Sequence, residues 1–579
     1  MLLLKFRGIL LSGVALFAVL VTPVLFAEEE EESVSSDRLL PPGVLLHVRL
    51  SDISDLKERL PKTGFGQMYQ DESMAKIRAQ VEKGFEKASE EAGKDLGFPL
   101  SDLLNLPTGE ASFALLLPAG RDLSGVAIME IDEQQETLDK ALAKLDEALT
   151  SKGAKKKSET VEEVEVTIYE TAKGEDSESE DSAKNTLCYF TKDGLFVAGT
   201  DLSVLQDVLT RWDGESEDVL AEEEIYSYIH SKCATREDDD SVMEWYADPI
   251  GLISAGLNAN EEQAFQAMMF ANYLPTVGLD KLKGVGGSFD IAEDDYDMHS
   301  KSFMYVEQPT SGVLRALVFP ATDLTPPAWV GADVPQYTAM NWDAAGAYTA
   351  LVEMADTIQN QPGASEQAMA KVSKDLGFNV KSDLIDLLDG QIVFLNAVSG
   401  DTEKPQQRIM MAVKLKDSTK FQETLNAMLE KAGSSVTERD FEGTKVYDIQ
   451  SPDPNMSPAL SISKDHLFVS THADMLEAAL RPSASDDETL AESEDYIEIK
   501  KLMPSMNSMV SFSDLSAQLK PSYEMLKKGQ LDGVTEGQFD FSVLPDFEKI
   551  EKFFSISGSY TIPDEKGVYS ESFLFGADE

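Results

Sequence analysis

Cysteine and histidine are both scarce in this chain, which narrows the chemistry it can carry. The 579 residues include two cysteines, Cys188 and Cys233, and five histidines. No C-x-x-C pair occurs, so the spacing typical of thiol metal sites and dithiol redox sites is missing. Cys188 lies in an apolar stretch, so we expect a small buried hydrophobic side chain there. A Cys188–Cys233 bridge is the alternative, since export would permit a disulfide.

The five histidines do not form the pattern of a metal site. His466 and His472 are the only close pair, and they flank an expected strand instead of sharing a helical face. A zinc centre needs at least a third protein ligand, for which the sequence offers no candidate. His47 lies on the polar face of an expected strand, and His466 lies in an expected hairpin turn. We therefore expect solvated histidines and assign no metal-binding or cofactor-binding residue.

Sequence motifs of nucleophilic catalysis are also few. No G-x-S-x-G, H-E-x-x-H, Walker loop or dinucleotide-binding fingerprint occurs. Residues 73–76 and 461–464 match S-x-x-K, and residues 62–64 match the K-T-G triplet of penicillin-recognising enzymes. Those enzymes place K-T-G after the serine, whereas here it precedes Ser73. We interpret Ser73 as a helix N-cap and the later match as a strand entering a turn, and we assign no catalytic residue.

Positive charge is also in short supply. Lys and Arg number 50 against 104 Asp and Glu, which gives a formal net charge of −54. That charge repels phosphate backbones and anionic lipid surfaces, so we expect no nucleic-acid partner. Carboxylates can bind cations, but no D-x-[DN]-x-[DN]-G loop is present. A solvated acidic surface is our first interpretation, and weak divalent-cation binding by surface carboxylates is the alternative.

No apolar run after residue 27 is long enough to span a bilayer. The first residues, in contrast, have the layout of an export signal: positive residues, the apolar run 9–21, and Ala27 at the cleavage position. The acidic run 28–32 favours cleavage over the alternative, an uncleaved anchor. We therefore expect residues 1–27 to be a signal peptide, the mature chain to carry no membrane span, and the protein to be periplasmic or secreted.

The sequence does contain an internal repeat. Residues 94–98 read K-D-L-G-F, and the same five residues return as 374–378, a displacement of 280 residues. Each copy is followed by S-D-L, by a glycine (Gly109 or Gly390) and by an apolar run. Later matches, such as Tyr226 with Tyr496, have a smaller displacement, which loop insertions in the first copy would produce.

The repeat predicts an α+β fold made of two tandem copies of one mixed helix and antiparallel-sheet unit. The expected boundaries are an acidic linker at 28–39, a first copy at 40–318, a Pro-rich linker at 319–332 and a second copy at 333–579. Gly97 and Gly377 should each take a positive φ after a long helix. The apolar residues beside them should be buried, namely Leu96, Phe98, Leu376 and Phe378. Residues 28–37 and 174–182 should lack regular structure.

Apolar periodicity predicts the local elements of the first copy. Expected strands lie at 44–50, 110–117, 125–131, 161–170, 186–191 and 195–198. Expected helices begin near residue 54 and cover 73–92, 134–152 and 202–209. In the first strand, the alternation assigns His47 and Arg49 to the polar face. The charged helix at 134–152 should turn four leucines inward.

The opening strand also carries a resemblance to a known family. Residues 41–48 read P-P-G-V-L-L-H-V, and 56–57 and 66–68 continue the pattern. This stretch resembles a family of exported bacterial proteins of unknown function, whose members open with a signal peptide and an L-P-x-x-x-L-x-x-V strand. Residues 334–342 are similar to the start of that family's second half. The resemblance implies an uncharacterised exported family, here with two tandem copies, and it brings no assigned activity.

The two expected copies share glycines, apolar positions and turn aspartates, but no reactive group. We therefore hypothesise an exported non-catalytic protein of the cell envelope with a binding or structural role. Its partner would be an unknown protein or envelope component. The alternative is an exported hydrolase with its site in one copy or in the cleft between copies. A deep cleft lined by clustered carboxylates, or a serine and a lysine within hydrogen-bonding reach, would favour the enzyme.

Overall fold

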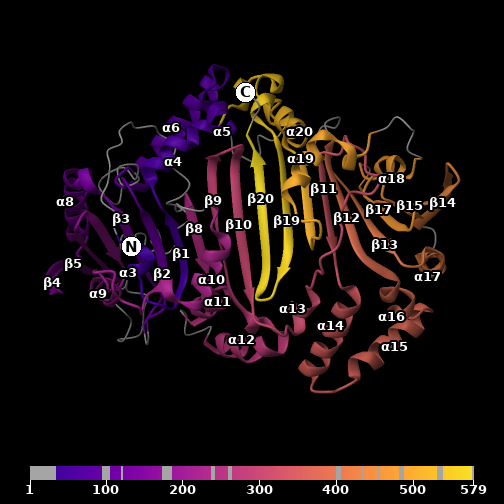
Figure 1. Ribbon diagram of the computed structural model, residues 1–579, viewed down its shortest axis with the longest axis horizontal. Coiled ribbons are helices and arrows are strands. Elements are labelled where there is room, and N and C mark those ends of the chain that lie inside the picture. Colours follow the sequence, from indigo (N-terminus) through magenta and orange to yellow (C-terminus); the bar gives the residue numbers. More distant parts are fainter. Residues whose placement is uncertain are drawn as a thin grey trace. The chain divides into compact units, whose positions relative to one another are not determined.

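A computed structural model gives the fold of this chain (Figure 1). It describes residues 34–93, 105–118, 121–171, 185–236, 241–258, 264–399, 406–432, 435–453, 455–481, 488–530 and 539–576. The chain divides into two compact units, Met1–Ala271 with Leu282–Tyr305 (unit 1) and Asn272–Lys281 with Val306–Glu579 (unit 2). No helix in the described ranges combines the length and the apolarity needed to cross a membrane.

The strands of unit 1 pair antiparallel with their neighbours in one sheet, and they run from indigo to magenta in Figure 1. The strands are β1 (Val44–Leu50), β2 (Ala111–Leu116), β3 (Ser124–Glu130), β4 (Lys155–Val161), β5 (Val164–Thr171), β6 (Asn185–Lys192), β7 (Leu195–Gly199), β8 (Met243–Ala247), β9 (Leu282–Glu293) and β10 (Tyr296–Val306). Their order across the sheet is β4-β5-β6-β7-β3-β2-β1-β8-β9-β10. The strand β1 therefore lies between β2 and β8, near the middle.

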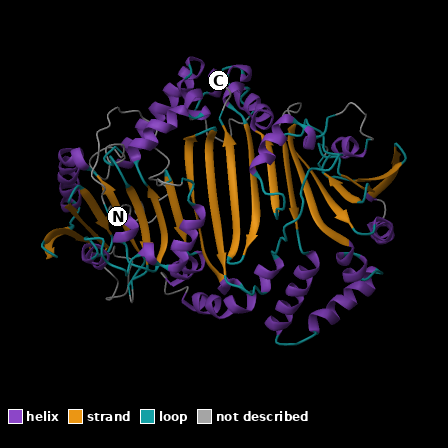
Figure 2. Cartoon of the chain, in the orientation of Figure 1, coloured by secondary structure: helices purple, strands orange, loops and turns teal. Residues whose placement is uncertain are grey.

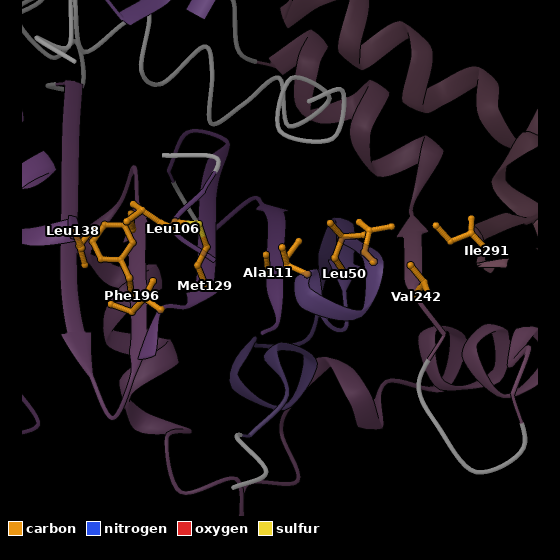
Figure 3. Close-up of a cluster of buried hydrophobic side chains, with 12 residues drawn as sticks. Leu50, Leu106, Ala111, Met129, Leu138, Phe196, Val242 and Ile291 are labelled. Carbon is orange, nitrogen blue, oxygen red and sulfur yellow. The ribbon is translucent and has the colours of Figure 1, made fainter. Parts of the chain in front are cut away.

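Helices of unit 1 pack around this sheet (Figure 2). They are α3 (Ser36–Leu39), α4 (Ile53–Arg59), α5 (Gly64–Gln70), α6 (Ala75–Gly93), α8 (Gln135–Ser151), α9 (Leu202–Thr210), α10 (Glu224–Cys233) and α11 (Pro249–Asn258), followed by α12 (Ala264–Val277). One core cluster gathers Leu138 of α8 and Phe196 of β7 with apolar residues of β1, β2 and β3. Figure 3 shows eight labelled members of this cluster, which extends to Val242 and Ile291.

Unit 2 is built on a sheet with the same kind of order. Its strands are β11 (Gln336–Asn341), β12 (Leu388–Ser399), β13 (Gln406–Leu415), β14 (Val436–Phe441), β15 (Thr444–Ile449), β16 (Ala459–Ser463), β17 (His466–Ser470), β18 (Met509–Asp514), β19 (Ile556–Asp564) and β20 (Gly567–Phe575). They follow one another as β14-β15-β16-β17-β13-β12-β11-β18-β19-β20, all antiparallel. The strand β11 therefore occupies in this sheet the place that β1 occupies in unit 1.

The helices of unit 2 lie around that sheet and at the ends of its strands (Figure 2). They are α13 (Gly312–Ala316), α14 (Ala344–Gln359), α15 (Ala364–Leu376), α16 (Val380–Asp383), α17 (Ser418–Ala432), α18 (Ala473–Leu480), α19 (Glu494–Leu502) and α20 (Leu515–Lys527). The core includes Tyr337 of β11, Phe468 of β17 and Ile499 of α19, all with at most 1 % of their surface exposed. Burying each such side chain contributes about 1.5–3 kcal/mol.

The predicted α+β fold class with antiparallel sheets is confirmed. The inward leucines of the 134–152 helix are found on α8, where Leu138, Leu145 and Leu149 are buried. Gly377 takes a φ of 83° directly after α15, as expected. The predicted tandem duplication and its boundaries stay a prediction. Gly97, with its neighbours Leu96 and Phe98, and the segment 174–182 lie outside the described residues.

Several local expectations were wrong. Residues 36–37 belong to the helix α3, although the segment 28–37 was expected to lack regular structure. Leu376 and Phe378 are half-buried, not buried. The strand β4 was missed because its sequence, K-K-K-S-E-T-V, is polar and nearly all exposed. It is an edge strand, and charged side chains on an edge oppose pairing with other chains.

Candidate functional site

A group of buried ionisable side chains crosses the centre of the sheet in unit 1. His47 is 0 % exposed and Arg49 is 6 % exposed, although both were expected on a solvated face of β1. That expectation was wrong because a second layer covers the face. Tyr226 from α10 and Ser36 from α3 both reach His47. Period-two alternation identifies residues that share a face, but it does not say whether that face is covered.

Arg49 holds two buried carboxylates. Its Nε lies 2.9 Å from Glu110 Oε2, and its Nη1 lies 3.0 Å from Glu244 Oε2. Glu110 and Glu244 are 8 % and 4 % exposed. Arg49 and Glu244 are direct partners in the β1–β8 register. Removing ions from water is costly, so each of these buried charges depends on the other two.

His47 and His230 both lie near Arg49, but their pKa values shift in opposite directions. Burial is the main cause that lowers the pKa of His47, to about 4, and the nearby Arg49 lowers it further. Burial also opposes charge on His230, but the carboxylate of Glu244 lies 2.6 Å from its Nε2 and raises the pKa. The side chain of His230 is 34 % exposed, so it links this buried group to solvent.

We call this group the Arg49 network. Its members are Ser36, His47, Arg49, Glu110, Tyr226, His230 and Glu244. Ser36 Oγ lies 3.3 Å from His47 Nε2, which is the pairing of a serine hydrolase. However, His47 Nδ1 faces the Tyr226 hydroxyl at 3.1 Å instead of a carboxylate, and Ser36 is only 1 % exposed. A substrate therefore has no access to this serine in the structure.

A groove in unit 2 is the second candidate site. It has a volume of about 830 Å³, within the usual range of about 300–1,000 Å³ for small-molecule sites. Strands β12 and β13 form its floor, and α18 and the segment 328–335 form its walls. Apolar and charged side chains share the lining, namely Trp329, Asp333, Leu395, Arg408, Met410, Asp474, Met475, Arg481 and Glu488.

The wall at 328–335 is fixed by backbone bonds within unit 2. Leu490 N–H donates to Val330 O at 2.9 Å, and Ala332 N–H donates to Glu488 O at 3.2 Å. The ring of Trp329 packs edge-on against Phe468, with centroids 4.9 Å apart. Residues 328–332 were expected to belong to the linker 319–332 and residues 333–335 to the second copy, and the backbone of this wall is tied to the body of unit 2.

The two S-x-x-K matches do not form serine–lysine pairs. Ser461 Oγ donates to Lys445 O at 2.7 Å, and Lys464 Nζ donates to the carbonyls of Ala479 and Arg481. The second match is therefore held by backbone contacts, although a hollow of about 480 Å³ adjoins it.

Ser73 does not act as the N-cap that the sequence suggested. It lies inside the short 3-10 helix Glu72–Met74, whose cap is Asp71. The Asp71 carboxylate accepts from Ser73 N–H at 2.8 Å, so the aspartate takes the role assigned to the serine.

The expectation of solvated histidines was also wrong in unit 2. His466 and His472 are 9 % and 8 % exposed. The hairpin turn consists of Lys464 and Asp465, which take φ values of 50° and 58°, so His466 is the first residue of β17. Its ring packs against Trp329 at 5.6 Å, and burial lowers its pKa.

Neither cysteine is bridged. Cys188 and Cys233 are free and buried, and burial raises the pKa of both thiols, to about 12 for Cys233. Cys188 Sγ donates to Gly199 O at 3.3 Å, in keeping with a packing role. Across the part of the chain that the structure describes, no three His, Cys, Asp or Glu residues are placed to hold a metal ion.

Both candidate sites were missed by pattern reading. Glu110 and Glu244 are 61 and 195 residues from Arg49, so no local spacing joins them. The available signal was a charged residue in each of several apolar strands, such as Arg49 in V-L-L-H-V-R-L. Such a residue needs a buried partner, which is a reason to search for opposite charges in other strands.

Comparison with known proteins finds a family that matches part of the chain. A family described as a protein of unknown function (DUF3352) matches residues 365–528, which include Arg408 and Asp474 of the groove. No curated protein and no solved structure matches the chain. The likeness supports an uncharacterised family and carries no activity with it.

Proposed function

We propose that this chain is an exported, non-catalytic protein that binds a ligand in the groove of unit 2. The observation that carries the proposal is the groove itself. Its floor is apolar, its rim carries both signs of charge, and its volume of about 830 Å³ suits a small molecule. Exposed surface of this mixed kind is typical of sites that orient a ligand by a few polar groups.

The lining favours binding over turnover. It includes one hydroxyl side chain, Thr489, whose Oγ1 donates to Glu492 Oε2 at 2.8 Å in a capping box. The charged groups Arg408 and Asp474 pair with each other at 2.5 Å. Such a lining can fix and neutralise a ligand, but it does not bring a nucleophile and a base together.

Export is part of the proposal because of the N-terminal pattern. A positive start, an apolar run and Ala27 form the layout of a signal peptide. The strongly acidic composition suits a solvated protein of the cell envelope or the exterior. We further propose that units 1 and 2 are tandem copies of one fold. The identical order of their ten strands supports this.

The binding proposal can be tested by filling the groove. Ala478 lines it and is exposed, so Ala478→Trp should occupy the space without disturbing the core. We expect the wild-type chain to bind the fluorescent probe anilinonaphthalene sulfonate saturably, and we expect Ala478→Trp to lose that binding.

The matched control is Ala370→Trp, which adds the same ring on the exposed surface of α15. It should bind the probe as the wild type does. Equal probe binding by Ala478→Trp and by the wild type would show that the groove is not the site.

A further inference from the structure

Two side-chain N–H donors of the groove lining have no hydrogen-bond partner among the described residues. They are Nε1 of Trp329 and Nε of Arg408, and both atoms are buried. A buried donor without an acceptor is unfavourable, and most native structures avoid it. Both groups are donors, so an acceptor oxygen of a ligand would satisfy either of them once a neighbouring side chain moves aside and uncovers it.

Arg408 lies at the end of an apolar row on the floor of the groove. In the β12–β13 register, Leu395 is opposite Met410 and Ala397 is opposite Arg408. Met410 and Leu395 are 1 % and 4 % exposed, whereas the Arg408 side chain is 26 % exposed. The floor therefore offers a ligand little of Met410 and Leu395, and its accessible atoms come from the half-buried Ala397 and from the guanidinium.

The present partner of Arg408 is Asp474 of α18. Its Oδ2 lies 2.5 Å from Nη2, and its side chain is 68 % exposed. This contact uses one terminal nitrogen and leaves Nε without an acceptor. A carboxylate that bonds both Nε and a terminal nitrogen would make the bidentate contact that the planar guanidinium favours.

Trp329 gives the wall at 328–335 a rigid ring. That ring packs edge-on against both Phe468 and His466, with centroid distances of 4.9 and 5.6 Å. The backbone bond from Leu490 N–H to Val330 O fixes the next residue of the same wall. Because the wall is held in this way, it keeps its shape when a ligand enters.

We propose, on the basis of the groove as the ligand site, that its ligand is an amphiphile with a carboxylate head and an apolar chain. The carboxylate takes the place of Asp474 on Arg408. The apolar chain packs on Ala397, Met475 and Ala478, which line the floor and the α18 wall and are at least partly exposed. No covalent step is involved.

The opposite charge preference is the rival, because Asp333, Asp474 and Glu488 also line the groove. Two features favour the carboxylate. Asp474 is exposed and already neutralised by Arg408, and both groups that lack a partner are donors. A cationic head would leave both donors without an acceptor.

The test is calorimetric titration of the full chain with three probes of equal chain length. They are decanoate, decanol and decyltrimethylammonium. We expect decanoate to bind best. Arg408→Gln should weaken decanoate binding by about tenfold or more, as expected for loss of a charge-assisted pair. Asp474→Asn should tighten it, because the competing carboxylate is removed. A gain of affinity cannot come from misfolding.

The matched controls lie in the same unit, away from the groove. Arg315 Nη2 pairs with Asp343 Oδ2 at 2.7 Å at the N-terminus of α14. Arg315→Gln and Asp343→Asn make the same charge changes and should leave decanoate binding unchanged. Equal effects of the control and groove variants would overturn the role of Arg408.

The three probes separate the two proposals. Equal binding of decanol and decanoate would keep the groove as a binding site and overturn the carboxylate preference. Stronger binding of decyltrimethylammonium would also overturn it, in favour of the acidic rim. Loss of affinity in Asp474→Asn would contradict the displacement step. If no probe binds the wild type, the carboxylate amphiphile and the groove proposal both fail.

Discussion

The centres of the two units use matching backbone bonds around different side chains. In unit 1, Ser51 N–H donates to Val242 O at 3.2 Å, just before β8. In unit 2, Asn341 N–H donates to Ser508 O at 2.9 Å, just before β18. Arg49 on β1 lies two residues before Ser51, and Ala339 on β11 lies two residues before Asn341. The arginine of unit 1 therefore corresponds to an alanine in unit 2.

The cross-strand neighbours of these two residues also differ, with a charged residue in unit 1 and an apolar residue in unit 2. Arg49 is opposite Glu244 in the β1–β8 register, and Ala339 is opposite Val510 in the β11–β18 register. Ala339 and Val510 are 1 % and 3 % exposed. Unit 2 therefore closes the same place with apolar atoms, at no cost of removing ions from water.

The ring contacts beside these positions are kept. His47 packs on Tyr226 with centroids 5.8 Å apart, and Tyr337 packs on Tyr496 at 6.5 Å. His47 and Tyr337 each lie two residues before the Arg49 or Ala339 position. Since unit 2 forms this centre without a histidine or an ion pair, the architecture itself does not require the charges of unit 1.

At the groove the charged residue lies in unit 2 and the uncharged one in unit 1. Gly125 in unit 1 and Ile409 in unit 2 each donate N–H to a threonine Oγ1 at 3.0 Å, and Thr200 and Thr471 donate back. The residue before Ile409 is Arg408, whereas unit 1 has a buried serine there, Ser124. Each unit thus carries its charged centre at a place where the other is uncharged.

Breaking the Arg49 network should have the largest effect. Arg49→Ala leaves Glu110 and Glu244 buried without their cation, so we expect the free energy of unfolding to fall by about 3–5 kcal/mol. Urea unfolding followed by tryptophan fluorescence measures it. Arg439→Ala removes an arginine whose side chain is 31 % exposed and should cost about 1 kcal/mol or less. Similar losses in the two variants would contradict the comparison.

Replacing the whole ion pair system should be far milder than breaking it. The triple variant Arg49→Met, Glu110→Gln and Glu244→Leu gives unit 1 an uncharged centre of similar volume, as in unit 2. We expect its unfolding free energy to equal that of the wild type or to exceed it by up to about 4 kcal/mol. The same urea titration measures it. A triple variant as unstable as Arg49→Ala would show that unit 1 needs these charges to fold.

His47 should make unit 1 sensitive to acid. Its pKa is lowered to about 4 in the folded chain and is about 6.5 when unfolded. The unfolded chain therefore binds the proton first, and stability falls as the pH drops from 6.5 towards 4, by about 3 kcal/mol. His47→Tyr, which supplies the residue of unit 2, should remove this loss in urea titrations at pH 7 and pH 4.5. An unchanged acid loss would assign it to other groups.

The sequence predicted elements well where one periodicity and one covered face decide the outcome. The helix α8 is an example, because its leucines repeat at helical spacing and point to one core. The strand β1 was predicted with its correct bounds, yet its polar residues were assigned to solvent because the covering residues, Tyr226 and Ser36, come from distant segments.

The candidate sites depend on such distant contacts even more. Arg49 meets Glu244 across 195 residues, and no local pattern encodes that pairing. A shift of one residue was enough to misplace His466, because the turn is formed by Lys464 and Asp465. In the groove, residues 328–332 were predicted as the end of the linker 319–332, and the bonds of this segment to residues 488–490 make it part of a wall.

The smallest expected effect concerns His230, which lies four residues after Tyr226, whereas unit 2 has Lys500 four residues after Tyr496. Glu244 raises the pKa of His230 in the folded chain against the opposing effect of burial. A raised pKa means that the folded chain binds the proton more tightly. The stabilisation is therefore present below the unfolded value of about 6.5 and is lost as the pH rises through the folded value. Because the side chain is 34 % exposed, solvent screening keeps the effect below about 1 kcal/mol.

His230→Lys keeps a cation beside Glu244 over the same range, so its stability should stay flat between pH 6 and pH 8.5, while that of the wild type declines slightly. His230→Gln removes the titration without restoring the cation and should match the wild type at pH 8.5. A decline in His230→Lys as large as that of the wild type would show that another group causes it.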